Sequence, residues 1–168
     1  MKIFHQSGMT IIELAIVLVV IGIIGSIALN KSSSPAALTI GQQADQFVSD
    51  IRHAQSLAQI WGCQLYFSVT SSGYQLRNKS AIATKPQCTT AGAIVTDPST
   101  GQVFSITLKN DVQFTGSSTI DFDFKGQPLN NATDLPLTAA TNYTLTGGGS
   151  TYNISVSHVT GFVSMSGP

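Results

Sequence analysis

The chain carries little charge. Only 10% of its 168 residues are charged, and eight basic residues balance eight acidic ones, so the formal net charge is zero. Proteins that bind nucleic acid through its phosphates need a basic surface, and we therefore expect no nucleic acid as a partner. The length fits one ordinary domain.

Residues that carry catalysis or hold metals are also scarce. The histidines His5, His53 and His158 lie too far apart to form a metal-ligand motif, and the two cysteines form no Cys-x-x-Cys unit. Neither the Gly-x-Ser-x-Gly nor the Ser-x-x-Lys nucleophile motif is present. Asp121 and Asp123 alternate in a predicted strand, where both are expected to be solvated. We expect no enzyme activity, no metal and no cofactor.

One long hydrophobic run stands out against this polar background. Residues 9–29 read MTIIELAIVLVVIGIIGSIAL, and a helix of this length would reach about 30 Å, the thickness of a bilayer core. The preceding MKIFHQSG contains Lys2 and no acidic residue, which predicts that this end stays in the cytoplasm and that the rest lies outside it. The run is therefore predicted to be a transmembrane helix.

The only glutamate of the chain, Glu13, lies inside this run. A cleaved signal peptide with a site at Ser26-Ile27-Ala28 is one interpretation, and a plain single-pass anchor is another. Both leave Glu13 unexplained, because a carboxylate deep in an apolar segment costs roughly 3 kcal/mol on insertion. A third interpretation must therefore explain why a carboxylate is present in this segment.

The segment from Gly8 to Leu14, GMTIIEL, closely resembles the prepilin processing site of type IV pilins and secretion pseudopilins. The resemblance implies cleavage after Gly8 by a prepilin peptidase and N-methylation of Met9, where the family usually has Phe. It also implies that Glu13 pairs with a terminal amine and sets helix register in a filament. Such pairing is physically reasonable because an unpaired charge in lipid is costly. Gly22 and Gly25 have the spacing of a helix-packing motif, but glycine is common in membrane helices in any case.

The downstream part predicts a second helical stretch and then strands. Residues 30–35 are polar and end in Pro35, which predicts a kink, and apolar residues recur every three or four positions from Ile40 to Trp61. Gly62 is the expected terminator. Alternating apolar residues then predict a hairpin over residues 63–78 and further strands near residues 103–108, 119–124, 142–145, 152–157 and 161–165. The predicted fold class is α+β, a long N-terminal helix packed on an antiparallel β-sheet head, as in type IV pilins.

The downstream segments FVSDIRHAQSLAQ, IDFDFKGQP and ISVSHVTGFV resemble minor pilins and pseudopilins of the GspH/FimT type. The combination of Gly62-Cys63, the SGYQL segment over 72–76 and Cys88 most resembles the minor pilins of mannose-sensitive haemagglutinin pili. The expected divisions are a leader over 1–8, a transmembrane and assembly helix over 9–29, a kinked amphipathic continuation over 30–62 and a head over 63–168. Outside the cytoplasm, Cys63 and Cys88 are expected to form a disulfide.

The resemblance implies a minor pilin that primes or supports pilus assembly and surface adhesion. Expected partners are the major pilin, other minor pilins, the prepilin peptidase, the inner-membrane assembly platform and membrane lipid. The expected location is the bacterial inner membrane, with the head in the periplasm, and then the extracellular pilus or a periplasmic pseudopilus. A type II secretion pseudopilin is the main alternative. A DNA-binding FimT-like pilin and a membrane-anchored periplasmic enzyme are weaker alternatives, because no Lys or Arg follows Lys125 and no reactive constellation is present.

Overall fold

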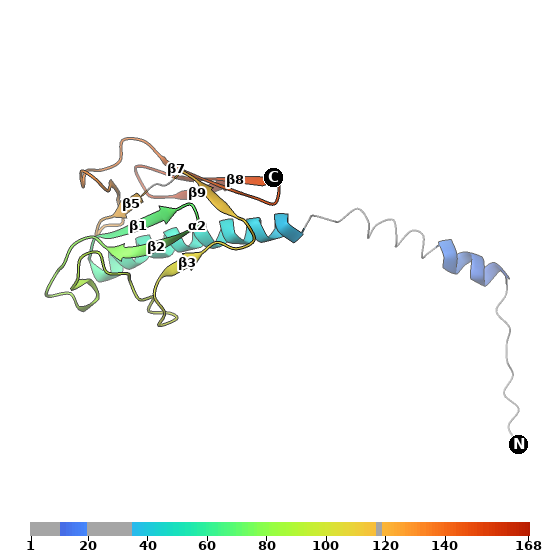
Figure 1. The fold of residues 1–168 in the computed structure, drawn as a ribbon, viewed down its shortest axis with the longest axis horizontal. Coiled ribbons are helices and arrows are strands. Elements are labelled where there is room, and N and C mark those ends of the chain that lie inside the picture. The colour runs from blue at the N-terminus through green and yellow to red at the C-terminus, as the bar shows by residue number, and fades with distance from the viewer. Residues whose placement is uncertain (1–10, 20–34, 117–118) are drawn as a thin grey trace, which may run out of the picture. The chain divides into compact units, whose positions relative to one another are not determined.

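The computed structural model describes residues 11–19, 35–116 and 119–168 (Figure 1). Contacts divide the chain into two compact units, Met1–Pro35 and Ala36–Pro168. In the first unit, residues 11–19 form a helix, called the N-terminal helix below. The second unit, called the body below, contains α2 (Pro35–Trp61) from Ala36 onward, a short 3-10 helix η1 (Pro86–Cys88) and the strands.

The N-terminal part corrects two predictions. Of the predicted span 9–29 the structure describes residues 11–19, which form a helix, and at about 1.5 Å per residue this described stretch reaches about 14 Å, half of a bilayer core. Among the described residues, no helix is both long and apolar enough to cross a membrane. The long N-terminal helix with a membrane-embedded first half and the single-pass inner-membrane location are therefore wrong. Residues 9–10 and 20–29, and the kink expected over 30–34, lie outside the described residues.

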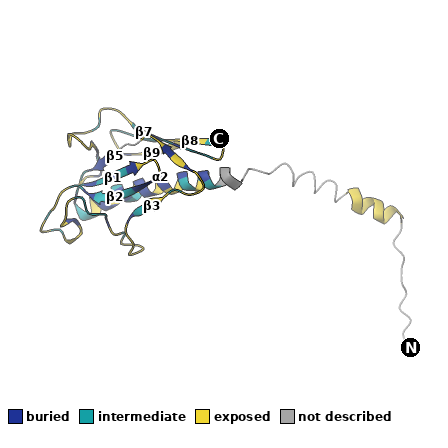
Figure 2. Cartoon of the chain, in the orientation of Figure 1, coloured by how far each residue is buried: buried dark blue, intermediate teal, exposed yellow. Residues whose placement is uncertain are grey.

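The amphipathic pattern of α2 is confirmed. Pro35 begins the helix. At this first position a backbone N–H has no partner inside the helix, so the N–H that proline lacks costs no hydrogen bond. The helix buries one stripe of residues at the predicted three- and four-residue spacing: Ile40, Ala44, Phe47, Val48, Ile51, Ala54, Leu57 and Ala58. The opposite face of α2 is largely polar and exposed (Figure 2).

Gly62 ends α2, as predicted. Its φ of 63° lies in the left-handed region that favours glycine. The N–H of Gly62 donates to the carbonyl of Gln59 (3.3 Å), and that of Cys63 donates to the carbonyl of Ala58 (3.2 Å), so two carbonyls in the last turn of the helix are satisfied. The chain then turns directly into the first strand.

The body contains two antiparallel sheets rather than the single sheet expected. The first has the order β3-β2-β1-β5-β6 and the second the order β4-β7-β8-β9. The strands are β1 (Leu65–Thr70), β2 (Gly73–Asn78), β3 (Ser105–Thr107), β4 (Gln113–Thr115), β5 (Thr119–Phe122), β6 (Pro128–Asn130), β7 (Thr141–Gly147), β8 (Ser150–Val156) and β9 (Val163–Ser166). Seven of these strands correspond to predicted ones, and β4 and β6 were not predicted.

One hydrophobic core joins α2 to both sheets. At its centre the ring of Phe47 lies 5.7 Å from that of Phe67 on β1 and 4.9 Å from that of Tyr74 on β2. The same ring lies 4.6 Å from Phe114 on β4 and 5.1 Å from Tyr143 on β7. A single helical residue therefore contacts both sheets through edge-on and tilted aromatic contacts.

Candidate functional site

Of the residues predicted to carry the N-terminal function, the structure describes one. Gly8, Met9, Gly22 and Gly25 lie outside the described residues, so cleavage, N-methylation and helix packing at those positions remain predictions. Glu13 lies within the N-terminal helix and is exposed.

The N-terminal helix is an uncovered apolar surface. Its large apolar side chains are all exposed, from Ile11 at 90% to Val17 at 42%. The other exposed apolar side chains on this helix are Ile12, Leu14, Ile16, Leu18 and Val19. Contiguous exposed apolar surface of this kind marks an interaction site in a soluble environment. Glu13 is the one carboxylate on it.

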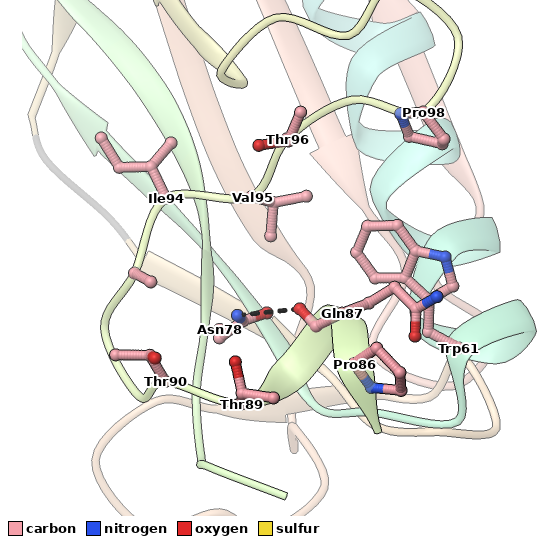
Figure 3. A pocket seen from close by; sticks show the side chains of 11 residues that line it. Trp61, Asn78, Pro86, Gln87, Thr89, Thr90, Ile94, Val95, Thr96 and Pro98 are labelled. Atoms are coloured by element: carbon pink, nitrogen blue, oxygen red, sulfur yellow. Dashed lines mark hydrogen bonds between the residues drawn. The ribbon is translucent and has the colours of Figure 1, made fainter. Parts of the chain in front are cut away.

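A pocket at the C-terminal end of α2 is a second candidate site (Figure 3). It has a volume of about 360 Å³. Its walls come from the end of α2, the end of β2 and the loop over residues 86–98. The lining residues are Trp61, Asn78, Pro86, Gln87, Thr89, Thr90, Ala93, Ile94, Val95, Thr96 and Pro98. None of these eleven side chains is ionisable near neutral pH. Sequence reasoning did not select these residues.

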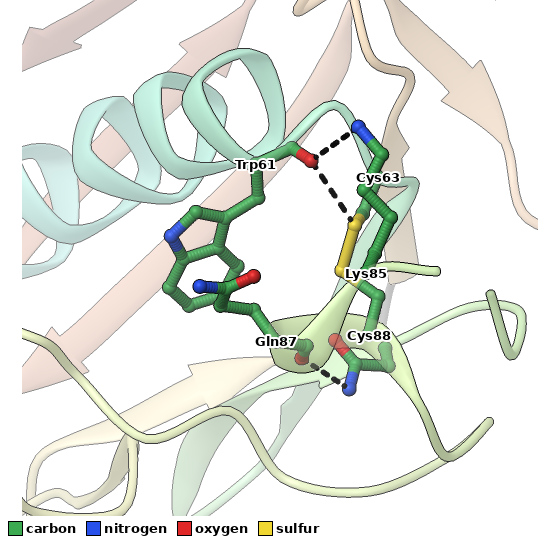
Figure 4. Close-up of a disulfide and its surroundings, with 6 residues drawn as sticks. Trp61, Cys63, Lys85, Gln87 and Cys88 are labelled. Atoms are coloured by element: carbon green, nitrogen blue, oxygen red, sulfur yellow. Dashed lines mark hydrogen bonds between the residues drawn. A yellow bond between two sulfur atoms is a disulfide. The ribbon is translucent and has the colours of Figure 1, made fainter. Parts of the chain in front are cut away.

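The disulfide predicted between Cys63 and Cys88 is present beside this pocket (Figure 4). Its Cα atoms are 6.5 Å apart, and both residues are buried. The bond ties the start of the first sheet to η1. In the same place the ammonium of Lys85, the residue before η1, donates to the carbonyl of Trp61 (2.9 Å) and so links the start of η1 to the end of α2.

A buried acidic group connects α2 to the first sheet. The hydroxyl of Tyr74 donates to Oδ2 of Asp50 (2.7 Å), and Nε2 of Gln46 donates to Oδ1 (2.8 Å). Burial raises the pKa of Asp50, although these two hydrogen bonds lower it in part. Burial also raises the pKa of Tyr74. Both carboxylate oxygens are engaged by neutral donors, so the arrangement holds the helix to the sheet and offers no free base.

A cavity of about 340 Å³ borders this group, lined by Asp50, Asp97, Phe104 and neighbouring residues. His53 lies at 3.3 Å from Oδ1 of Asp97 and stacks on Phe104 with ring centroids 6.1 Å apart. Hydrogen bonds from the backbone and side chain of Ser99 hold the pKa of Asp97 below its usual value. The carboxylate of Asp97 is therefore stabilised in its ionised form by the loop that carries it.

Asp121 differs from the prediction. It was expected to be solvated together with Asp123, yet it is fully buried. Nζ of Lys79 lies 2.9 Å from Oδ2 of Asp121 and 3.4 Å from Oδ1 of Asp134, so the lysine that directly follows β2 pairs with the buried carboxylate. Burial raises the pKa of Asp121, and Lys79 offsets part of that effect. Asp123 instead accepts hydrogen bonds from the backbone N–H groups of residues 125 and 127, so the two aspartates form no paired site.

In the part of the chain that the structure describes, no group of three or more histidine, cysteine or acidic side chains could hold a metal ion. No protein-family model, curated protein or solved structure matches the chain. Among the described residues, the exposed N-terminal helix and the pocket beside the disulfide are two candidate surfaces for function.

Proposed function

We propose that this chain is a minor subunit of a type IV pilus-like filament, in which the N-terminal helix is covered by corresponding helices of neighbouring subunits. The observation that carries the proposal is that all seven large apolar side chains described on this helix are exposed. Burying a large apolar side chain contributes about 1.5–3 kcal/mol, so covering seven of them would contribute on the order of 10 kcal/mol per subunit. Such a helix is a strong assembly element.

Glu13 gives the proposed assembly its register. Inside a bundle of apolar helices a carboxylate needs a cationic partner, because an isolated buried charge is very unfavourable. Cleavage after Gly8 would create such a cation, the α-amino group of Met9 on a neighbouring subunit. The GMTIIEL segment supports this step, since it resembles the site where prepilin peptidases cut and methylate.

In the proposed filament, the body is the part of the subunit that is displayed on the filament surface. Residues from Ala36 onward form a compact unit with their own core and disulfide. Among the described residues, every member of the core cluster lies at Ile40 or beyond, so the N-terminal helix contributes no side chain to this core. Assembly and display are thus assigned to separate parts of the chain.

The test is incorporation into filaments in the native host. Glu13→Gln removes the charge and keeps the shape of the side chain, and we expect at least a tenfold loss of the subunit from sheared filaments, measured by quantitative immunoblotting. Asp45→Asn is the matched control, because Asp45 is an exposed carboxylate on α2. Its incorporation should equal that of the wild type. Equal incorporation of the Glu13 variant, or absence of the wild-type chain from filaments, contradicts the proposal.

A further inference from the structure

We propose that the pocket beside the disulfide binds a neutral carbohydrate, with Trp61 as the stacking surface and Asn78 as the central hydrogen-bonding group. This inference goes beyond the filament role and does not depend on it. It is carried by the pocket's lack of charge, by an unsatisfied buried amide oxygen and by the aromatic residue on its wall (Figure 3).

The absence of charged side chains among the lining residues favours a neutral ligand. Its lining contains the amides of Asn78 and Gln87 and the hydroxyls of three threonines, together with apolar groups. The ammonium of Lys85 lies nearby but donates to the carbonyl of Trp61. An anionic or cationic ligand would therefore lose hydration without gaining a counter-charge. A neutral molecule with many hydroxyl groups matches the amide and hydroxyl groups of the lining.

Asn78 marks the place where a ligand hydroxyl is needed. The residue is only 4% exposed, and its Nδ2 donates to the carbonyl of Gln87 (3.1 Å). Its Oδ1 is buried and receives no hydrogen bond from any residue in the described part of the chain. Buried polar atoms without a partner are rare in native proteins and point to an absent partner. A hydroxyl group of a sugar can donate to this oxygen.

Trp61 provides the complementary apolar contact. It is the only tryptophan of the chain and the last residue of α2, and it is partly exposed at the pocket. Figure 3 shows its indole on one side of the pocket, with the strip from Ile94 to Thr96 on another. Sugar rings present an apolar face of C–H groups that packs against an aromatic plane, while their hydroxyls point outward. The volume of about 360 Å³ falls in the range of small-ligand sites and accommodates one or two sugar rings.

The walls of the pocket are held in place before a ligand arrives. The disulfide fixes η1 to the beginning of β1 (Figure 4). The N–H of Asn78 donates to the carbonyl of Ala93 (3.0 Å), and the N–H of Gly92 donates to the carbonyl of Asn78 (2.7 Å), so the loop is paired with the end of β2. A preformed site loses little conformational entropy on binding.

The experiment is a fluorescence titration of the full chain in a zwitterionic detergent without a sugar head group. Because Trp61 is the only tryptophan, its emission reports on the pocket directly. The probes are the methyl glycosides of glucose, galactose, mannose and N-acetylglucosamine, with glucuronic acid as a charged comparison. We expect at least one neutral glycoside to give a saturable change with a Kd of about 0.1–10 mM, and glucuronic acid to bind at least tenfold more weakly.

Substitutions then test the assignment of the residues. Asn78→Ala should weaken binding of the same glycoside about tenfold, whereas the matched change Asn142→Ala, on an exposed asparagine of β7, should leave it unchanged. If Asn78→Ala fails to fold, as judged by circular dichroism, Thr96→Tyr replaces it, since this exposed lining residue can be enlarged to obstruct the pocket. Failure of every neutral glycoside to bind, or equal binding by the Asn78, Thr96 and Asn142 variants, overturns the proposal.

Discussion

Removal of the disulfide should destabilise the body strongly. Cys63 and Cys88 are separated by 25 residues, and for a closed loop of that size the chain-entropy model gives about 3.5 kcal/mol of stabilisation at 25 °C. With a urea m-value of about 1.5 kcal/mol/M, the unfolding midpoint of Cys63→Ala/Cys88→Ala should fall by about 2 M. The effect arises because the uncrosslinked unfolded chain has more conformations.

Urea unfolding followed by the fluorescence of Trp61 measures this loss, because Trp61 lies two residues from Cys63. Reduced wild-type protein is the control, since it keeps both sulfur atoms and loses only the cross-link. The two samples should agree to within about 1 kcal/mol, the contribution of the small cavities left by two sulfur atoms. A loss below about 1 kcal/mol in both samples would refute the reasoning that the cross-link restricts the unfolded chain.

Three further predictions concern the core and the buried charges. Phe47→Ala should lower the free energy of unfolding by about 4 kcal/mol and Phe47→Leu by about 1.5 kcal/mol, measured by urea denaturation, because this ring contacts both sheets. Burial raises the pKa of Asp50 above its ordinary 3.8, so the contribution of this group to stability should be fully present below the unfolded-state pKa and be lost as the pH rises through the folded-state pKa. Asp50→Asn should flatten that fall in denaturation curves between pH 3 and 7. Lys79→Met should lower the free energy of unfolding by about 3 kcal/mol at pH 7, because Asp121 is then buried without its cation. Adding Asp121→Asn to that variant should recover most of the lost free energy in the same assay.

The local elements with clear periodicity could be predicted from the sequence. The stripe of α2 follows from apolar residues at helical spacing, and Gly62 is a recognisable terminator. The hairpin of β1 and β2 follows from alternation on either side of a short polar turn. The disulfide could be predicted because the chain has only two cysteines.

Features that depend on long-range pairing could not be predicted. β4 and β6 have three residues each, too few to show a period of two. The division into two sheets is set by pairings such as β1 with β5 and β4 with β7, which join segments far apart in the sequence. Asp121 is buried and pairs with Lys79, which directly follows β2, and the alternation of residues within the strand of Asp121 carries no information about that partner.

The pocket beside the disulfide had only one signal in the sequence, the single tryptophan at the end of a helix. Asn78 is one of many asparagines in a polar chain, and its unsatisfied oxygen becomes visible only when the loop over residues 86–98 is placed around it. The N-terminal helix shows the opposite case. There the sequence indicated an interaction surface, but the membrane-spanning helix predicted from it was wrong.

The central claim is that this chain is processed after Gly8 and assembled through its N-terminal helix. Mass spectrometry of the N-terminus of the chain recovered from sheared filaments of the native host tests it most directly. We predict a terminus at N-methylated Met9. A chain that still begins at Met1, or one that starts after Ala28, would contradict the claim.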